Sequence, residues 1–249
     1  MGFLVGILAF LSEYLDSALG MGYGTALAPL LLLIGHDPLA VIPAILISQL
    51  ATDIAACIFH HNLRNVDLRL GSADFKVALP LALCSCVGVV IAALVALRIP
   101  RWFLTLYIGI LIISMGILIL FTANKTIRFS RFKILGISLL ASFNKGVSGG
   151  GYGPLLMGGQ VLSGVSAKNA VGITAFAEAL TCLAGFLVYL IMGKTVDWRL
   201  TGLLTISASF AVPVAALTVK ALSIERLRKY IGILITILGA LTLLKITSK

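Results

Sequence analysis

The chain has 249 residues, of which 60% are hydrophobic and only 11% are charged. Soluble domains carry about 25% charged residues, so this composition excludes a soluble globular protein. The net charge of +10 comes from lysines and arginines that cluster between the apolar segments. This pattern is typical of cytoplasmic loops in membrane proteins and does not indicate nucleic-acid binding.

Eight apolar segments follow one another along the chain. They cover residues 3–34, 38–59, 77–97, 102–122, 134–163, 169–192, 200–219 and 230–244. Each can cross a hydrocarbon core of about 30 Å, which takes roughly 20 residues. The sequence therefore predicts an all-α, multi-pass helical bundle in the lipid bilayer of the cytoplasmic membrane, without a separate soluble domain. The first segment contains acidic residues and lacks a basic start, so we expect a retained helix rather than a signal peptide.

The first and fifth segments are interrupted by the same glycine-rich pattern. Residues 20–24 read Gly-Met-Gly-Tyr-Gly, and residues 149–153, which lie 129 positions later, read Gly-Gly-Gly-Tyr-Gly. We call them the first and the second glycine break. A continuous helix over 3–34 would be about 48 Å long, too long for a simple span. Paired interruptions in two halves of a membrane protein indicate a transporter's binding site.

Two further matches indicate an internal duplication. Residues 66–70 resemble residues 196–200, and residues 107–112 recur unchanged as 230–235. We predict two homologous four-segment repeats, residues 1–122 and 134–249, joined by a cytoplasmic linker at 123–133. In each repeat the first segment is broken at glycine.

The orientation of the two repeats depends on the broken segments. If these cross the membrane, the repeats are parallel; if they turn back as hairpins, the repeats are inverted. The loop lysines and arginines divide 11 against 7 in the crossing arrangement and 12 against 6 in the hairpin arrangement. Positive residues favour the cytoplasmic side, so inverted repeats are preferred, with the loops at 60–76 and 123–133 inside and the N-terminus outside. The parallel arrangement stays open.

The glycine breaks are the predicted substrate site. A short helix is expected to begin after each break, at Thr25 and at Pro154. Helix N-termini offer free N–H groups and a partial positive charge to an anion. The alternative is that the glycines only let helices pack closely. The candidate substrate-binding residues are Gly20, Gly22, Tyr23, Gly24, Thr25, Asn144, Lys145, Gly149, Gly150, Gly151, Tyr152 and Gly153.

Ionisable residues inside apolar segments are costly and indicate function. Lys145 occupies the repeat position of Asp16, and Glu178 occupies that of Gln49. Two roles stay open for Lys145: a structural ion pair with Asp16, or a contact with the substrate anion. A satisfied buried carboxyl is the alternative to proton coupling at Glu178. The proton-coupling candidates are Glu178, Asp53, Asp16 and Glu13.

The sequence predicts neither an enzyme nor a bound metal or cofactor, because it contains no metal-ligand spacing and no Ser-His-Asp arrangement. His60 and His61 fall at a segment end, where we expect a solvated or interfacial pair. The main rival function is a cation channel, since Gly-Tyr-Gly also occurs in potassium filters. Two copies instead of four, and Lys145 beside one of them, argue against a channel. A channel filter with four Gly-Tyr-Gly stretches would need a dimer of this chain. Formation of a homo-oligomer is left open by the sequence.

The glycine breaks resemble those of the sulfite exporter (TauE/SafE) family, also called the toluene-sulfonate uptake permease family. Its members carry a glycine-rich stretch, then apolar residues and a proline, near the start of each half; residues 149–154 and 20–29 match this pattern. Residues 164–172 and 196–198 are also similar to the family's second half. The resemblance implies secondary transport of sulfite, a sulfonate or another small sulfur-containing or organic anion. Met21 departs from the triple-glycine form and leaves open how equally the two breaks contribute.

Overall fold

The computed structural model describes the backbone of residues 2–122, 131–194 and 196–221, with residues 236, 237, 240, 241 and 244. The regular elements in this part of the chain are all helices. Residues 123–130 of the predicted linker, and most of the predicted segment at 230–244, lie outside the described residues. The helices are α1 (Gly2–Leu19), α2 (Tyr23–Ile34), α3 (Pro38–Asn62), α4 (Ala73–Ala96), α5 (Arg101–Thr122), α6 (Arg131–Ser148), α7 (Tyr152–Leu162), α8 (Ala167–Ile191), α9 (Trp198–Ser209) and α10 (Ala211–Ala221).

Six helical stretches are long and apolar enough to cross a membrane, which confirms the prediction of a multi-pass helical bundle. The outer surface suits lipid, since large apolar side chains such as Phe3, Leu83 and Ile206 are 84%, 59% and 64% exposed. The six stretches are Gly2–Leu19, Pro38–Asn62, Ala73–Ala96, Arg101–Leu118, Ala167–Ile191 and Trp198–Lys220.

Local sequence sets several helix starts. The Asp37 carboxylate accepts a hydrogen bond from the Leu39 amide at 2.8 Å, and a proline occupies the first position of α3. Ser72 and Asp197 cap α4 and α9 in the same way. Such side chains satisfy N–H groups that have no partner inside the helix.

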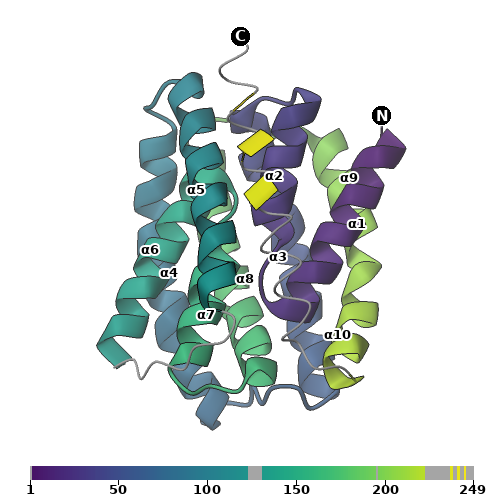
Figure 1. Ribbon diagram of the computed structural model, residues 1–249, viewed down its shortest axis with the longest axis vertical. Helices are drawn as coiled ribbons and strands as arrows, with labels where there is room; N and C mark the ends of the chain where they lie inside the picture. The colour runs from purple at the N-terminus through teal and green to yellow at the C-terminus, as the bar shows by residue number, and fades with distance from the viewer. Residues whose placement is uncertain are drawn as a thin grey trace.

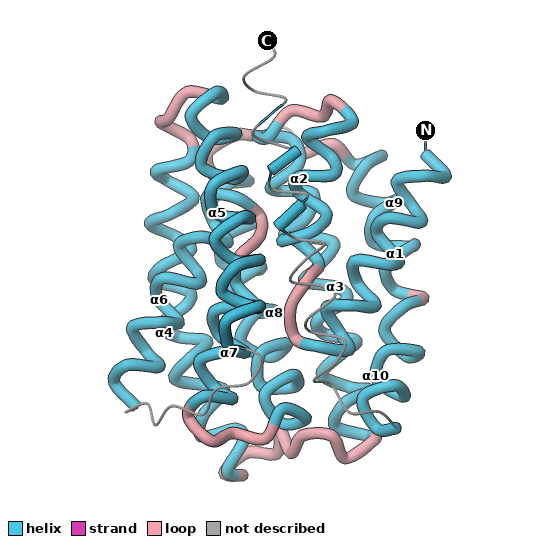
Figure 2. The backbone as a smooth tube through the Cα atoms, viewed as in Figure 1, coloured by secondary structure: helices cyan, strands magenta, loops and turns pink. Residues whose placement is uncertain are grey.

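α1 and α2 form a helical hairpin. α1 descends from the N-terminal end of the bundle and α2 returns toward that end, while α6 and α7 enter and leave from the opposite end (Figure 1). The glycine breaks lie inside the bundle, as does the short junction between α9 and α10, whereas the other connections lie at the ends of the bundle (Figure 2). At the far end, the Asn169 side chain donates to Asp74 at 2.9 Å, so the α7–α8 and α3–α4 connections lie together. The predicted helix starts at Thr25 and Pro154 are each two residues late, since α2 and α7 begin at Tyr23 and Tyr152.

Each hairpin packs on helices from the other half of the chain. α6 lies along α4, and α1 packs against α9 and α10. The hydroxyls of Tyr14 on α1 and Thr218 on α10 are hydrogen-bonded at 3.1 Å. α3 and α8 contact each other along the middle of the bundle.

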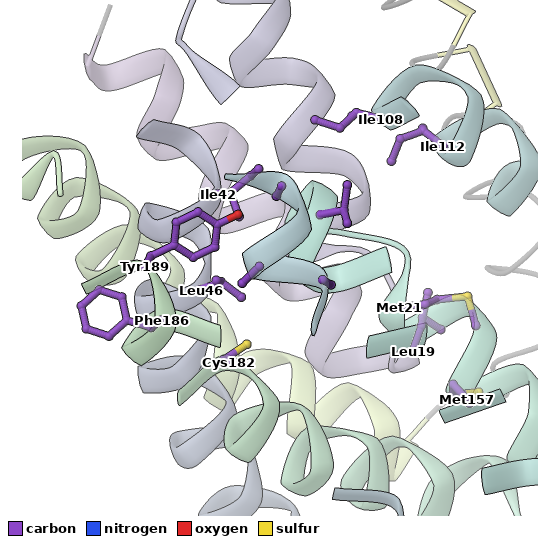
Figure 3. Close-up of a cluster of buried hydrophobic side chains, with 14 of the residues drawn as sticks. Leu19, Met21, Ile42, Leu46, Ile108, Ile112, Met157, Cys182, Phe186 and Tyr189 are labelled. Atoms are coloured by element: carbon purple, nitrogen blue, oxygen red, sulfur yellow. The ribbon is translucent and has the colours of Figure 1, made fainter. Parts of the chain in front are cut away.

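A large apolar cluster surrounds the glycine breaks. Leu19 and Met21, on either side of Gly20, lie near Met157 of α7, and Leu46 of α3 lies near Cys182 of α8 (Figure 3). All five side chains are buried. This cluster holds the tips of the two hairpins in the protein interior, where non-helical backbone is tolerated.

Candidate functional site

The two glycine breaks have positive φ at corresponding positions. Gly20 and Gly149 have φ of 66° and 74°, and Gly22 and Gly151 have φ of 154° and 77°. Positive φ is strained for residues with a Cβ, so these turns require glycine. In both breaks the first glycine amide still donates to the carbonyl four residues earlier, at 2.6 and 2.8 Å, before the helix stops.

The two hairpin tips cross in direct backbone contact. A Cβ at Gly24 would overlap the carbonyl of Gly149, and one at Gly150 would lie 2.7 Å from the carbonyl of Gly24. On the other side, a Cβ at Gly153 would lie 2.7 Å from the Cα of Met21. Close packing therefore explains these glycines in this conformation, and their role in substrate binding stays a prediction.

Backbone N–H groups at the glycine breaks already donate hydrogen bonds to oxygen atoms of the protein. The Gly151 amide donates to the Thr25 hydroxyl at 3.0 Å, and the Gly150 amide donates to the Ser148 hydroxyl at 3.0 Å. An anion at these amides must therefore replace oxygen atoms that the protein itself supplies.

A buried polar chain links four helices beside the breaks. Lys145 of α6 is fully buried, and its Nζ lies 2.8 Å from Glu178 Oε1 of α8. The same ammonium donates to Gln49 Oε1 of α3. The Gln49 amide in turn donates to Asp16 Oδ2 of α1 at 2.9 Å. The predicted ion pair between Asp16 and Lys145 is therefore wrong, because Gln49 lies between them and Lys145 pairs with Glu178.

The predicted carboxyl candidates gather at the same place. Glu13 accepts hydrogen bonds from the hydroxyls of Ser17 at 2.6 Å and Thr52 at 2.9 Å. Asp53 Oδ2 is buried and has no hydrogen-bond donor among the described residues. Next to it is a cavity of about 10 Å³, also lined by Asp16 and Glu178.

Three other predicted site residues form hydrogen bonds with the surrounding helices and not with the carboxylates of this centre. The hydroxyl of Tyr23 is hydrogen-bonded to Ser48 of α3 at 2.6 Å, and that of Tyr152 to Ser85 of α4 at 2.9 Å. Asn144 accepts a hydrogen bond from the Tyr107 hydroxyl at 2.6 Å. These side chains fasten the hairpins to the surrounding helices.

Sequence reasoning misjudged His60. The expected solvated position is wrong, because α3 continues to Asn62 and buries this side chain completely. Its Nε2 lies 2.9 Å from the Ser17 carbonyl, and the Asn65 amide lies 3.1 Å from its Nδ1. A carbonyl can only accept, so Nε2 carries the proton and Nδ1 accepts from Asn65. His60 thus fixes the last turn of α1 beside the first break.

A larger, open cavity of about 590 Å³ lies at the α3–α4 connection. Its walls include two arginines, Arg64 and Arg69, together with Asp67 and Asp74. Asn65 also lines it, so the His60 contact joins this cavity to the buried centre. The second cavity forms a polar recess at one end of the bundle.

A helical bundle in which half-helices from both ends meet at a buried charged centre is typical of membrane transporters. The family described as "Sulfite exporter TauE/SafE" matches residues 4–244, and this chain belongs to it. The chain is 25% identical over 250 residues to the "Probable membrane transporter protein YtnM" of Bacillus subtilis (strain 168), an alignment that covers 95% of this chain and 81% of that protein. No solved structure matches the chain. The protein is therefore a multi-pass membrane transporter and not an enzyme, which confirms the resemblance found in the sequence.

Proposed function

We propose that this transporter moves a small anion by a secondary, gradient-driven mechanism, and that the anion binds where the two glycine breaks meet. The substrate class is sulfite, a sulfonate or another sulfur-containing or organic anion, as the family description suggests. The observation that carries the proposal is Lys145. Among the described residues it is the only buried lysine or arginine, and it lies one turn before the second break.

We also propose that residues 1–122 and 134–249 are inverted repeats. The two hairpins enter from opposite ends of the bundle, which supports this arrangement (Figure 1). The contacts of α6 with α4, and of α1 with α9 and α10, support a two-fold relation between the halves. Separation of the crossed tips toward one end at a time would open the site alternately to the two sides, as in other transporters with inverted repeats.

The Lys145–Glu178 pair suggests how a proton is coupled to the anion. While Glu178 is ionised, it occupies Lys145 and competes with an incoming anion. Protonation of Glu178 removes this competitor, so a proton and a monovalent anion load together with no change in net charge. Asp16 and Asp53 lie beside Glu178, and their negative charges would repel an anion, so an anion needs Lys145 released from Glu178.

The open cavity supports the same function. Arg64 and Arg69 line its wall beside Asp67 and Asp74, so the recess offers two guanidinium groups to an anion although its formal charge is balanced. The contact from Asn65 to His60 leads from this recess toward the centre. We therefore assign the recess as the entry for the anion at this end of the bundle.

The test is uptake of radiolabelled sulfite into proteoliposomes, with and without a pH gradient. We expect uptake that an inwardly directed proton gradient increases. Lys145→Met should abolish uptake, because the chain loses the buried positive charge that binds the anion. Glu178→Gln should keep uptake but lose its response to the gradient. Lys220→Met is the matched control, because Lys220 is exposed at the end of α10.

Two outcomes would contradict the proposal. Unchanged flux and unchanged selectivity in Lys145→Met would reduce this residue to a structural role. Proton dependence that persists in Glu178→Gln would remove that carboxyl from coupling. Competition by unlabelled sulfonates and carboxylates in the same assay separates sulfite from the other anions of the proposed class.

A further inference from the structure

Three carboxylates converge on the small cavity beside the first glycine break. Asp16 of α1, Asp53 of α3 and Glu178 of α8 each place one oxygen so that the three oxygens lie within 4.8 Å of one another. The side chains are only 6%, 2% and 3% exposed. A hard cation lies about 2.3–2.6 Å from its oxygen ligands, so oxygens at this spacing can share one ion.

The charges around the cavity do not balance. Lys145 is paired with Glu178, and Glu13 is satisfied by two hydroxyl donors. Asp16 accepts an amide hydrogen bond, whereas Asp53 Oδ2 has no donor in the described part of the chain and its side chain lines the cavity. A buried carboxylate without a donor or a counter-charge is costly. A carboxyl at this position must therefore either take up a proton or bind a cation.

The cavity also lies at the C-terminal end of a half-helix. α1 ends at Leu19, and Ser17 and Gly20 line the cavity. The C-terminal end of a helix carries a partial negative charge. In transporters with discontinuous helices, such ends take part in binding Na⁺ or H⁺. The Ser17 carbonyl is held in place by His60 at 2.9 Å, which fixes this wall of the cavity.

Size and ligand chemistry select the ion. The cavity volume of about 10 Å³ is at the lower limit for a single water-sized particle. Oxygen ligands do not favour soft metals. Ca²⁺ takes 6–8 oxygen ligands and Mg²⁺ keeps several waters, for which there is no room here. We propose that Asp16, Asp53 and Glu178 form a binding site for one dehydrated sodium ion.

This site goes beyond the proposed anion transport, because sodium binding requires no anion. Only a role of the bound ion in driving transport rests on the proposed function. Since Glu178 belongs both to the sodium site and to the Lys145 pair, bound sodium weakens the hold of Glu178 on Lys145. Sodium and a proton would then compete at the same carboxyl.

The test is equilibrium binding of radioactive sodium to the purified transporter, without substrate and at constant pH and ionic strength, with choline as the replacing cation. We expect saturable binding of one ion per chain. Asp53→Asn keeps the shape of the side chain and removes its charge. Loss of a partner outside the ligand shell weakens metal sites roughly 10–100-fold, so loss of this ligand should weaken binding at least as much. Asp37→Asn is the matched control and should bind sodium normally, since it makes the same change at a helix cap outside the triad.

Three outcomes would overturn the proposal. Absence of saturable binding, or equal affinity in Asp53→Asn, would exclude the site, even if anion uptake behaves as proposed. Displacement of sodium by equimolar Ca²⁺ or Mg²⁺ would show a divalent site instead. If Asp53→Asn does not fold, Asp16→Asn takes its place, with thermal unfolding in choline as the check on folding. Normal sodium binding together with absent sulfite uptake would leave the sodium site standing and remove the anion proposal.

Discussion

Removal of the positive charge at the centre tests whether Lys145 and Glu178 act as one unit. Lys145→Met keeps the length of the side chain but leaves Glu178 without its partner at 2.8 Å and Gln49 Oε1 without a donor. With an effective dielectric constant of about 20, the direct attraction at this distance is about 6 kcal/mol. The cost of desolvating both charges offsets much of this value. Loss of one partner of a buried pair costs about 3–5 kcal/mol, which is the loss of unfolding free energy that we expect.

A double-mutant cycle isolates the pair. The second single variant is Glu178→Gln, and the double variant carries both changes, which leaves no unpaired charge at this position. We expect the double variant to be less destabilised than the sum of the single variants, with a coupling energy of about 2–3 kcal/mol. Unfolding is measured by titration with SDS in mixed micelles. The control cycle pairs Glu178→Gln with Lys220→Met, which should be additive because Lys220 is exposed on α10. A coupling energy below about 0.5 kcal/mol, which is the error of simple additivity, would refute the paired arrangement.

Three further predictions concern packing, a buried histidine and a surface pair. Gly153→Ala should destabilise the fold by about 1–3 kcal/mol, since its Cβ would press on the opposite hairpin. Gly158→Ala is the comparison variant and should be neutral or stabilising, because the space around Gly158 is open. Thermal unfolding of the two variants measures the difference. His60→Ala should lower the free energy of unfolding by about 1–3 kcal/mol, because a buried carbonyl and a buried amide lose their partner, and a wild-type value in SDS titration would contradict this. Arg101→Ala should change unfolding by less than about 1 kcal/mol, since Arg101 is 71% exposed in its pair with Asp37. Asp37→Ala should cost about 1 kcal/mol more in the same assay, because it also removes the cap of α3, and equal effects would exclude the capping role.

The sequence was sufficient to predict the helices because lipid imposes a simple requirement on them. A segment inside the hydrocarbon region must be apolar and must satisfy its own backbone, so composition and length alone locate it. The glycine breaks were visible because these backbone turns use positive φ, which few residues other than glycine adopt. These features depend on residues that are neighbours in the sequence, so the sequence alone is enough to predict them.

The arrangement of the charged centre was not predictable in the same way. The predicted repeat makes Asp16 and Lys145 equivalent positions, but nothing local showed that the Gln49 side chain lies between them. The three carboxylates around the small cavity come from α1, α3 and α8, so no spacing along the chain brings them together. His60 shows the same limit, since its burial depends on contact with Ser17, which is 43 residues away. Two sequence signals identified parts of this network: the ionisable residues inside apolar segments, and the predicted repeat equivalence of Gln49 and Glu178.

The packing of α1 has a consequence for how the protein is made. α1 is synthesised first, yet its main helical neighbours besides α2 are α9 and α10, which are synthesised more than 170 residues later. Until they arrive, Val5 and Ala9 lack the α9 side chains that bury them, and the Tyr14 hydroxyl lacks its partner Thr218. We expect the nascent chain to hold this helix near the insertion machinery until the second half emerges, and truncation before residue 198 to leave a product that quality-control proteases remove.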